Sequence, residues 1–232
     1  MEQGLVTALR GTSRRMRSSR RLTRVLFGAD IDRGVHDDLW DATTLTLRKA
    51  LRAFVKDGDR VLDLGTGHVG ILSIFVSKLR KVDVVAVDVS PAFVENARRI
   101  AAASGARVSF AQSDWFSKVE GTFDVIFCNL PYLPTAAGAA AGATTEHRQI
   151  WDGGEDGLAH ARTILAQAPR FLSPRGRLLL GLNTLYVPRE RTKRVIADNA
   201  PPMHLERIVR SLISPGEVYV ISPGSGTGQS TT

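Results

Sequence analysis

The residues best suited to chemistry are Asn129, Leu130, Pro131 and Tyr132, which stand together at the end of an apolar run. The run, residues 123–128, is typical of a buried strand, so the tetrapeptide falls where such a strand ends. An asparagine amide can accept hydrogen bonds, and a tyrosine ring can stack on a flat group. The four residues could therefore hold a planar polar group, although Asn-x-Pro is also common in ordinary turns.

Acidic residues and glycines mark the ends of three apolar runs upstream of the tetrapeptide. Glycine tolerates positive φ and has no side chain, so a glycine turn lets a ligand approach the backbone closely. A carboxylate has two acceptor oxygens, which suits it to neighbouring hydroxyl groups. The residues concerned are Asp63, Gly65, Thr66, Gly67, Asp88, Val89, Asp114 and Trp115. Ligands of open α/β sheets bind beyond the carboxyl ends of the strands, so we expect one ligand site there.

The glycine turn and the tetrapeptide together resemble two signatures of class I S-adenosylmethionine (SAM) methyltransferases that modify planar nitrogens. The resemblance implies that the side-chain oxygen of Asn129 and the main-chain carbonyl of Leu130 accept hydrogen bonds from a substrate NH2 group. Pro131 disfavours a helical backbone at Leu130, which keeps that carbonyl aimed at the substrate. Tyr132 would stack on the flat substrate group and fix its plane.

The same resemblance implies that SAM is the cofactor and that residues of the glycine turn and the three acidic strand ends bind it. Asp88 would bind the ribose hydroxyls and Asp114 the adenine amino group. Trp115 or Phe116 would cover the adenine ring. The glycines also fit the G-x-G-x-x-G fingerprint of nicotinamide dehydrogenases. Asp63 ahead of the glycines suits the methyltransferase pattern better, and nothing downstream resembles a hydride-transfer site.

Three segments narrow the resemblance to the HemK-type glutamine N5-methyltransferases, which modify peptide-chain release factors. Residues 112–117 look like the third motif of that family, and residues 129–134 are similar to its Asn-Pro-Pro-Tyr-Ile-Pro. Residues 151–158 are similar to its Asp-Gly-Gly-x-Asp-Gly-Leu segment, which broader methyltransferase groups usually lack. The resemblance covers roughly residues 34–222. It implies a SAM-dependent enzyme that methylates a protein glutamine, with a translation factor as partner.

Departures from the family pattern leave the substrate open. Leu130 replaces a proline, and Asn-Leu-Pro-Tyr is itself familiar from ribosomal RNA adenine dimethyltransferases. The helical domain that recognises the release factor is missing or reduced to a basic arm. A nucleobase amino group on ribosomal RNA and a small molecule are therefore alternatives to glutamine, and a non-catalytic RNA-binding module is a further one. Residues 146–148, Glu-His-Arg, stand where the family often has Glu-Pro-Arg, and Arg148 could contact an anionic substrate group.

The elements that would position these residues alternate regularly along the chain. The expected strands are residues 60–64, 82–87, 108–112, 124–128, 177–182, 204–212 and 217–221. The expected helices are residues 39–55, 70–79, 91–103, 157–171 and 188–198. This alternation predicts an α/β, Rossmann-like fold with a mostly parallel seven-stranded sheet and helices on both faces. Residues 136–145, rich in Ala, Gly and Thr, are expected to form a mobile loop over the site.

Charge is distributed unevenly over the 232 residues, whose net charge is +8. Residues 1–24 hold seven arginines against one glutamate, which gives this segment +6. A basic arm on a near-neutral body is a typical RNA-binding feature, although it could equally be a solvated helix or a disordered tail. We expect three parts: a basic arm over residues 1–33, helical or partly disordered, a methyltransferase domain over 34–222, and a disordered tail over 223–232.

Composition excludes several other classes of protein. The single cysteine, Cys128, rules out an internal disulfide and favours a reducing, cytoplasmic compartment. No apolar run approaches the ~20 residues of a membrane helix. The five histidines show no metal-ligand spacing, so no metal site is expected. The sequence leaves the oligomeric state and the role of the arm open.

Overall fold

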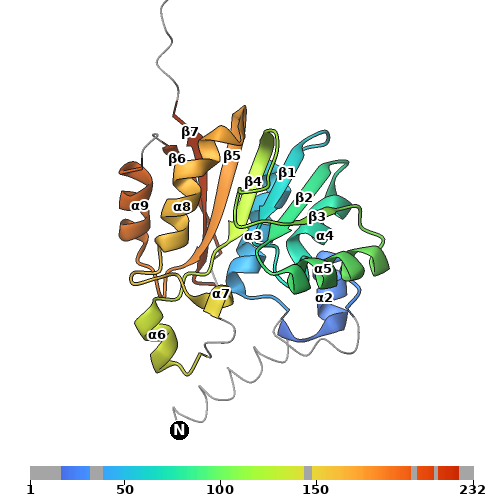
Figure 1. Ribbon diagram of the computed structural model, residues 1–232, viewed down its shortest axis with the longest axis horizontal. Helices are drawn as coiled ribbons and strands as arrows, with labels where there is room; N and C mark the ends of the chain where they lie inside the picture. The colour runs from blue at the N-terminus through green and yellow to red at the C-terminus, as the bar shows by residue number, and fades with distance from the viewer. Residues whose placement is uncertain (1–16, 32–38, 144–147, 200–202, 212–213, 225–232) are drawn as a thin grey trace, which may run out of the picture.

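The computed structural model describes residues 17–31, 39–143, 148–199, 203–211 and 214–224. Within them the chain forms a seven-stranded sheet of order β3-β2-β1-β4-β5-β7-β6 (Figure 1). The strands are β1 (Arg60–Leu64), β2 (Asp83–Asp88), β3 (Ser109–Gln112), β4 (Phe123–Asn129), β5 (Leu172–Asn183), β6 (Met203–Arg210) and β7 (Gly216–Pro223). Strands β1 to β5 pair in parallel, and β7 is antiparallel to both β5 and β6. The predicted mostly parallel, Rossmann-like sheet is confirmed.

Alternating side chains of the central strands build two hydrophobic cores, one on each face of the sheet. Val61 and Val125 pack on one face with α3 and α4, whereas Leu62 and Ile126 pack on the other with α8. All four side chains are almost fully buried. Because both faces are covered, the strands read as continuous apolar runs in the sequence.

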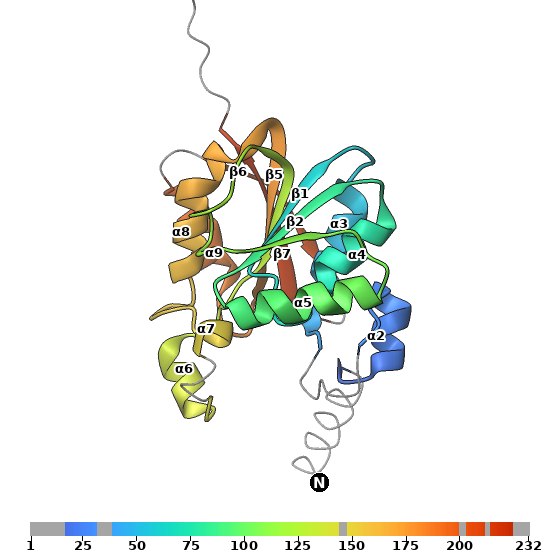
Figure 2. The ribbon, with the colours of Figure 1, turned by 45° about the vertical axis from the view of Figure 1, so that its right-hand side comes forward.

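The helices lie on both faces of the sheet, as predicted (Figures 1 and 2). They are α2 (Arg20–Phe27), α3 (Ala42–Phe54), α4 (Ile71–Leu79), α5 (Pro91–Ala103), α6 (Thr135–Ala140), α7 (Arg148–Trp151), α8 (Ala159–Gln167) and α9 (Arg189–Ala197). Helix α5 begins at Pro91 after the N-cap Ser90, whose side chain accepts a hydrogen bond from the backbone of Phe93. The expectation of a loop over residues 136–145 is wrong in its first part, where α6 forms. None of the described helices is both long and apolar enough to cross a membrane.

Part of the predicted basic arm packs on the body of the protein. Phe27 of α2 is 1% exposed and meets the ring of Phe75 edge-on, with centroids 6.3 Å apart. Thr23 accepts a hydrogen bond of 3.1 Å from the indole N–H of Trp40. Residues 1–16 of the arm and 225–232 of the tail lie outside the described residues.

Candidate functional site

A cavity of about 530 Å³ lies beyond the carboxyl ends of β1, β2 and β4. This is the edge where a parallel α/β sheet places its ligands. The structure brings the residues predicted for the glycine turn, the strand ends after it and the tetrapeptide to the wall of this one cavity. They are Asp63, Gly65, Thr66, Gly67, Asp88, Val89, Asp114, Trp115, Asn129, Leu130, Pro131 and Tyr132.

The glycine turn after β1 folds back on the end of β2. Gly65 and Gly67 have φ of 71° and 68°, conformations that favour glycine over other residues. The backbone N–H groups of Gly65 and Thr66 both donate to the carbonyl of Val87, at 2.9 Å. The N–H of Gly67 donates to the Asp88 carboxylate, also at 2.9 Å. The turn and Asp88 thus form one rigid wall of the cavity.

Asp63 is a buried acid at the base of this wall. It is 3% exposed, and its Oδ2 accepts hydrogen bonds from the hydroxyl groups of Ser73, at 2.6 Å, and Thr66, at 2.9 Å. Burial raises the pKa of Asp63 to about 7, although the two hydroxyl donors oppose that effect. Close to neutral pH, a cationic ligand would therefore favour the ionised form of this side chain.

The charge of the cavity suits a cationic ligand that also carries hydroxyl groups. Asp88 is 7% exposed, and its two oxygens accept hydrogen bonds from the backbone of Gly67 and Ser90. Burial raises its pKa, and these backbone donors act in the opposite direction. The described lining residues include four aspartates, with neither lysine nor arginine. An anionic dinucleotide would find neither lysine nor arginine among these described residues.

Trp115 forms the side of the cavity that faces the glycine turn. It is the non-glycine residue with positive φ, 47°, among the described residues. Its ring lies near Gly65, and its centroid is 5.2 Å from that of His160. Phe116, the alternative cover for an adenine ring, is instead buried and stacked on Phe171. Trp115 is therefore the aromatic residue of the pair that a ligand could touch.

The tetrapeptide presents an acceptor that no described residue bonds. Asn129 Oδ1 is buried and has no hydrogen-bond partner among the described residues, while its Nδ2 lies 3.4 Å from Thr44 Oγ1. Tyr132 donates a hydrogen bond of 2.9 Å from its hydroxyl group to Asp41. The side chain of Leu130 is buried in the core beside α8, and its N–H donates to the carbonyl of Gly181 at 3.3 Å. Leu130 thus faces the cavity mainly through its backbone.

Residues 151–158 pack against the tetrapeptide and the residue that follows it. Leu133 exchanges two backbone hydrogen bonds with this segment, one to Trp151 at 2.9 Å and one from Gly153 at 2.8 Å. Gly157 lies so close to the tetrapeptide that an added Cβ would meet the carbonyl oxygen of Tyr132 at 2.5 Å. Arg148, a candidate contact for an anionic substrate, forms an ion pair with Asp152 of this segment.

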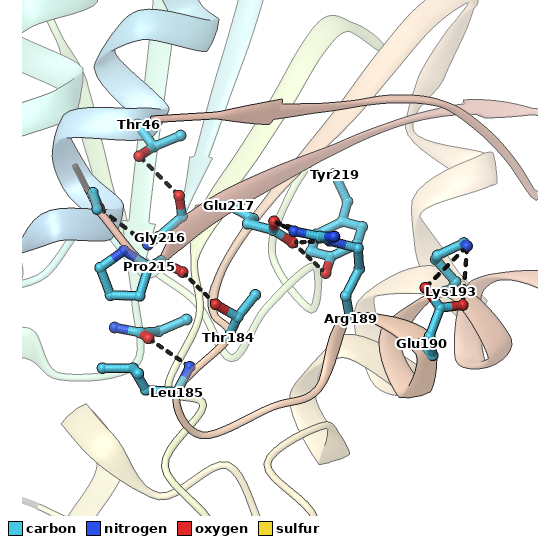
Figure 3. A network of polar contacts seen from close by, with 12 residues as sticks. Thr46, Thr184, Leu185, Arg189, Glu190, Lys193, Pro215, Gly216, Glu217 and Tyr219 are labelled. Carbon is cyan, nitrogen blue, oxygen red and sulfur yellow. Dashed lines mark hydrogen bonds and ion pairs between the residues drawn. The ribbon is translucent and has the colours of Figure 1, made fainter. Parts of the chain in front are cut away.

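Tyr186 is a cavity residue that sequence reasoning missed. Its ring stacks on Tyr132, with centroids 6.1 Å apart and planes at 25°, and the residue is 45% exposed. The turn that carries it is fixed at both ends (Figure 3): Thr184 bonds to the carbonyl of Pro215, and Arg189 pairs with the buried Glu217. The signal was available, because Tyr186 follows β5, a fifth strand that ends at the same edge of the sheet.

The remaining sequence expectations for the site concern acids and metals. Asp41, the N-cap of α3, and Thr44 in its first turn also line the cavity. Within the described part of the chain, no three His, Cys, Asp or Glu side chains cluster closely enough to hold a metal ion. His147 lies outside the described residues, as does His36.

Comparisons with known proteins place the chain in a family. A family model described as "Methyltransferase domain" matches residues 55–184, which is more than half of the chain. The release factor glutamine methyltransferase of Deinococcus radiodurans is 38% identical over 131 residues, or 56% of this chain and 47% of the relative. The chain thus spans about half the length of the curated relatives it matches.

Solved structures share the fold. A methyltransferase from Pyrococcus furiosus superimposes with a TM-score of 0.68 at 21% identity, covering 92% of this chain and 98% of that one. The T. thermophilus 16S rRNA N2 G1207 methyltransferase, solved in complex with AdoMet and guanosine, gives a TM-score of 0.56 at 20% identity. That match covers 84% of this chain and 45% of the other.

Proposed function

The chain belongs to the methyltransferase-domain family, in its HemK-like class I branch, and we propose that it methylates a planar amide or amino nitrogen. The cofactor is SAM, which supplies an electrophilic methyl group on a sulfonium centre. Our first choice of substrate is the side-chain amide of a protein glutamine. A translation factor is the expected partner, as the name of the D. radiodurans relative implies.

The charge and the polar groups of the cavity suit SAM. Asp63 and Asp88 are buried carboxylates facing a cavity without lysine or arginine among its described lining residues, as a ligand with positive charge requires. Asp88 would bind the ribose hydroxyls and Asp114 the adenine amino group. Trp115 would cover the adenine ring from the side of Gly65.

The orphan acceptor of Asn129 is the observation that carries the proposal. A buried polar atom without a partner costs free energy, so its retention in a cavity favours a ligand that supplies the missing donor. A substrate NH2 group is such a donor. The neutral amide oxygen of Asn129 is not a base, so it orients the nitrogen and does not remove its proton. Tyr132 and Tyr186 would fix the plane of the amide from the side.

Methyl transfer to glutamine is tested with SAM labelled in its methyl group and a purified bacterial release factor. We expect label in the protein that survives nuclease, is lost to protease, and is released as methylamine by acid hydrolysis of the amide. Asn129→Ala should slow turnover by about 10²–10³-fold while SAM binding stays nearly unchanged. Equal loss of turnover and of SAM binding would place Asn129 in the cofactor site instead.

A nucleobase amino group is the second candidate, and Leu130 in place of proline is the observation that favours it. Both substrates present a planar NH2 group, so Asn129 and Tyr132 serve either one. The same labelled SAM, incubated with the purified protein and a lysate of a host that lacks it, separates the two substrates. Label lost to nuclease and retained after protease treatment would replace glutamine by RNA as the substrate.

A further inference from the structure

The N-terminus of α3 contacts both polar side chains of the tetrapeptide. Asp41 is the N-cap of α3, and its Oδ1 accepts hydrogen bonds from the Thr44 backbone N–H at 2.7 Å and the Thr44 hydroxyl at 2.6 Å. In return, Thr44 Oγ1 accepts from the Asp41 backbone N–H at 3.1 Å. This reciprocal pair is a capping box, which by itself is a common way to begin a helix.

The hydroxyl group of Thr44 has one proton, and that proton is used. A carboxylate only accepts hydrogen bonds, so the bond to Asp41 consumes the proton of Thr44. Towards Asn129 the Thr44 oxygen can then act only as an acceptor. The amide of Asn129 must therefore turn its Nδ2 towards Thr44, at 3.4 Å, which leaves Oδ1 without a described partner. The capping box thus selects one of the two possible orientations of this amide.

The second oxygen of the same carboxylate positions the aromatic ring. Asp41 Oδ2 accepts the hydroxyl proton of Tyr132 at 2.9 Å, across 91 positions of the sequence. The hydroxyl of Thr43 lies 3.4 Å from the same phenol oxygen. Burial and the charge of Asp41 raise the pKa of Tyr132 well above its usual range, so the phenol keeps the proton that it donates. Asp41 therefore orients both the amide of Asn129, through Thr44, and the ring of Tyr132.

We propose that Asp41 and Thr44 are positioning residues, which hold Asn129 and Tyr132 in the orientation that receives a substrate NH2 group. This inference rests on the proposed function. Without the Thr44 hydroxyl, the amide of Asn129 is free to flip and to turn its N–H groups towards the substrate. Two NH2 groups that are both donors cannot form the required hydrogen bond. The loss should appear in turnover, because Asp41 and Thr44 set the orientation of Asn129, not the affinity for SAM.

Paired variants of Thr44 test the proposal. Thr44→Val keeps the shape and removes the hydroxyl, whereas Thr44→Ser keeps the hydroxyl and serves as the matched control. We expect Thr44→Val to lower kcat by about 10–100-fold, the usual effect of removing a group that orients a functional side chain, with KM and the Kd for SAM little changed. Thr44→Ser should restore most of the rate. In an Asn129→Ala background, Thr44→Val should have little further effect.

Two results would overturn the proposal. One is an unchanged kcat in Thr44→Val, and the other is an equal fold-loss with and without Asn129. A readout independent of catalysis is the side-chain NH2 resonance of Asn129 in ¹⁵N-labelled protein without ligand. It should shift in Thr44→Val and not in Thr44→Ser, and an unchanged resonance would refute the contact. If the wild-type chain transfers no methyl group, yet the Asn129 resonance shifts in Thr44→Val and not in Thr44→Ser, only the proposed function is refuted.

Discussion

Replacing Asp63 by asparagine should stabilise the ligand-free protein increasingly as the pH rises. Asp63 is 3% exposed, and burial raises its pKa from 3.8 to about 7 against the opposing hydroxyl groups of Ser73 and Thr66. An asparagine oxygen can still accept both hydroxyl donors, so the variant keeps those hydrogen bonds and removes the buried charge.

The magnitude follows from the two pKa values. The unfolded chain releases the proton of Asp63 at lower pH than the folded protein does, so the contribution of Asp63 to the free energy of unfolding is greatest below 3.8. It falls as the pH rises and levels off above about 7. At about 1.4 kcal/mol per pKa unit the full loss is about 4 kcal/mol, of which about 2–3 kcal/mol falls between about pH 5 and pH 8. Asparagine does not titrate, so the advantage of the variant should grow by this amount.

Urea denaturation of both proteins at several pH values between about 5 and 8 measures this difference. Asp152→Asn is the matched control. Hydrogen bonds from Thr135 and Arg148 lower the pKa of Asp152 to about 2, so it is ionised in both states over this range. Its effect on stability should not change with pH. A difference between Asp63→Asn and wild type that is equal at both ends of the range would refute the burial of a titrating carboxyl group.

Three further changes test other parts of the site. Gly157→Ala should destabilise the protein by about 1–3 kcal/mol and slow turnover, because the added Cβ would clash with the carbonyl of Tyr132. Gly142→Ala is the control, since Gly142 also has positive φ but has open space around it. That variant should lose only the free energy of backbone strain, about 1 kcal/mol. Asp88→Ala should weaken SAM binding by about 1–3 kcal/mol in calorimetry, and tight binding of NAD by the wild type would contradict the assignment of the cavity. Deleting residues 1–16 leaves α2 intact and should not change methylation of a protein glutamine; a rate that falls steeply with salt and with this deletion would indicate RNA.

Local chemistry made much of the fold predictable. Ser90 and Pro91 are a cap and a first helical residue, and α5 begins where they predict. Strand β5 begins at Leu172, five residues before the predicted start at 177, because Leu172 pairs with Phe123 ahead of a bulge. Helix α6 was missed because its Ala- and Gly-rich sequence has no apolar periodicity.

The sequence predicted the part of the site that lies at the ends of neighbouring parallel strands. Residues at the carboxyl ends of neighbouring parallel strands had to meet, and Asp63, Asp88 and Asn129 do line one cavity. The hydrogen bond between Asp41 and Tyr132 was not predictable, since it depends on how the first turn of α3 packs against the loop after β4. A capping residue and a ligand-orienting residue look the same in a sequence.

The position of β7 has a consequence for the order in which the chain can assemble. Among the described strands, β6 pairs with β7 alone, and β7 follows it in the sequence. During synthesis, β6 therefore has no sheet partner until β7 has been made and has paired with β5. The first residue of β7, Gly216, also lies against the start of α3, where an added Cβ would stand 2.7 Å from the Cα of Thr43. A nascent chain that stops before β7 therefore lacks the support that sets α3, and should remain inactive until that strand is complete.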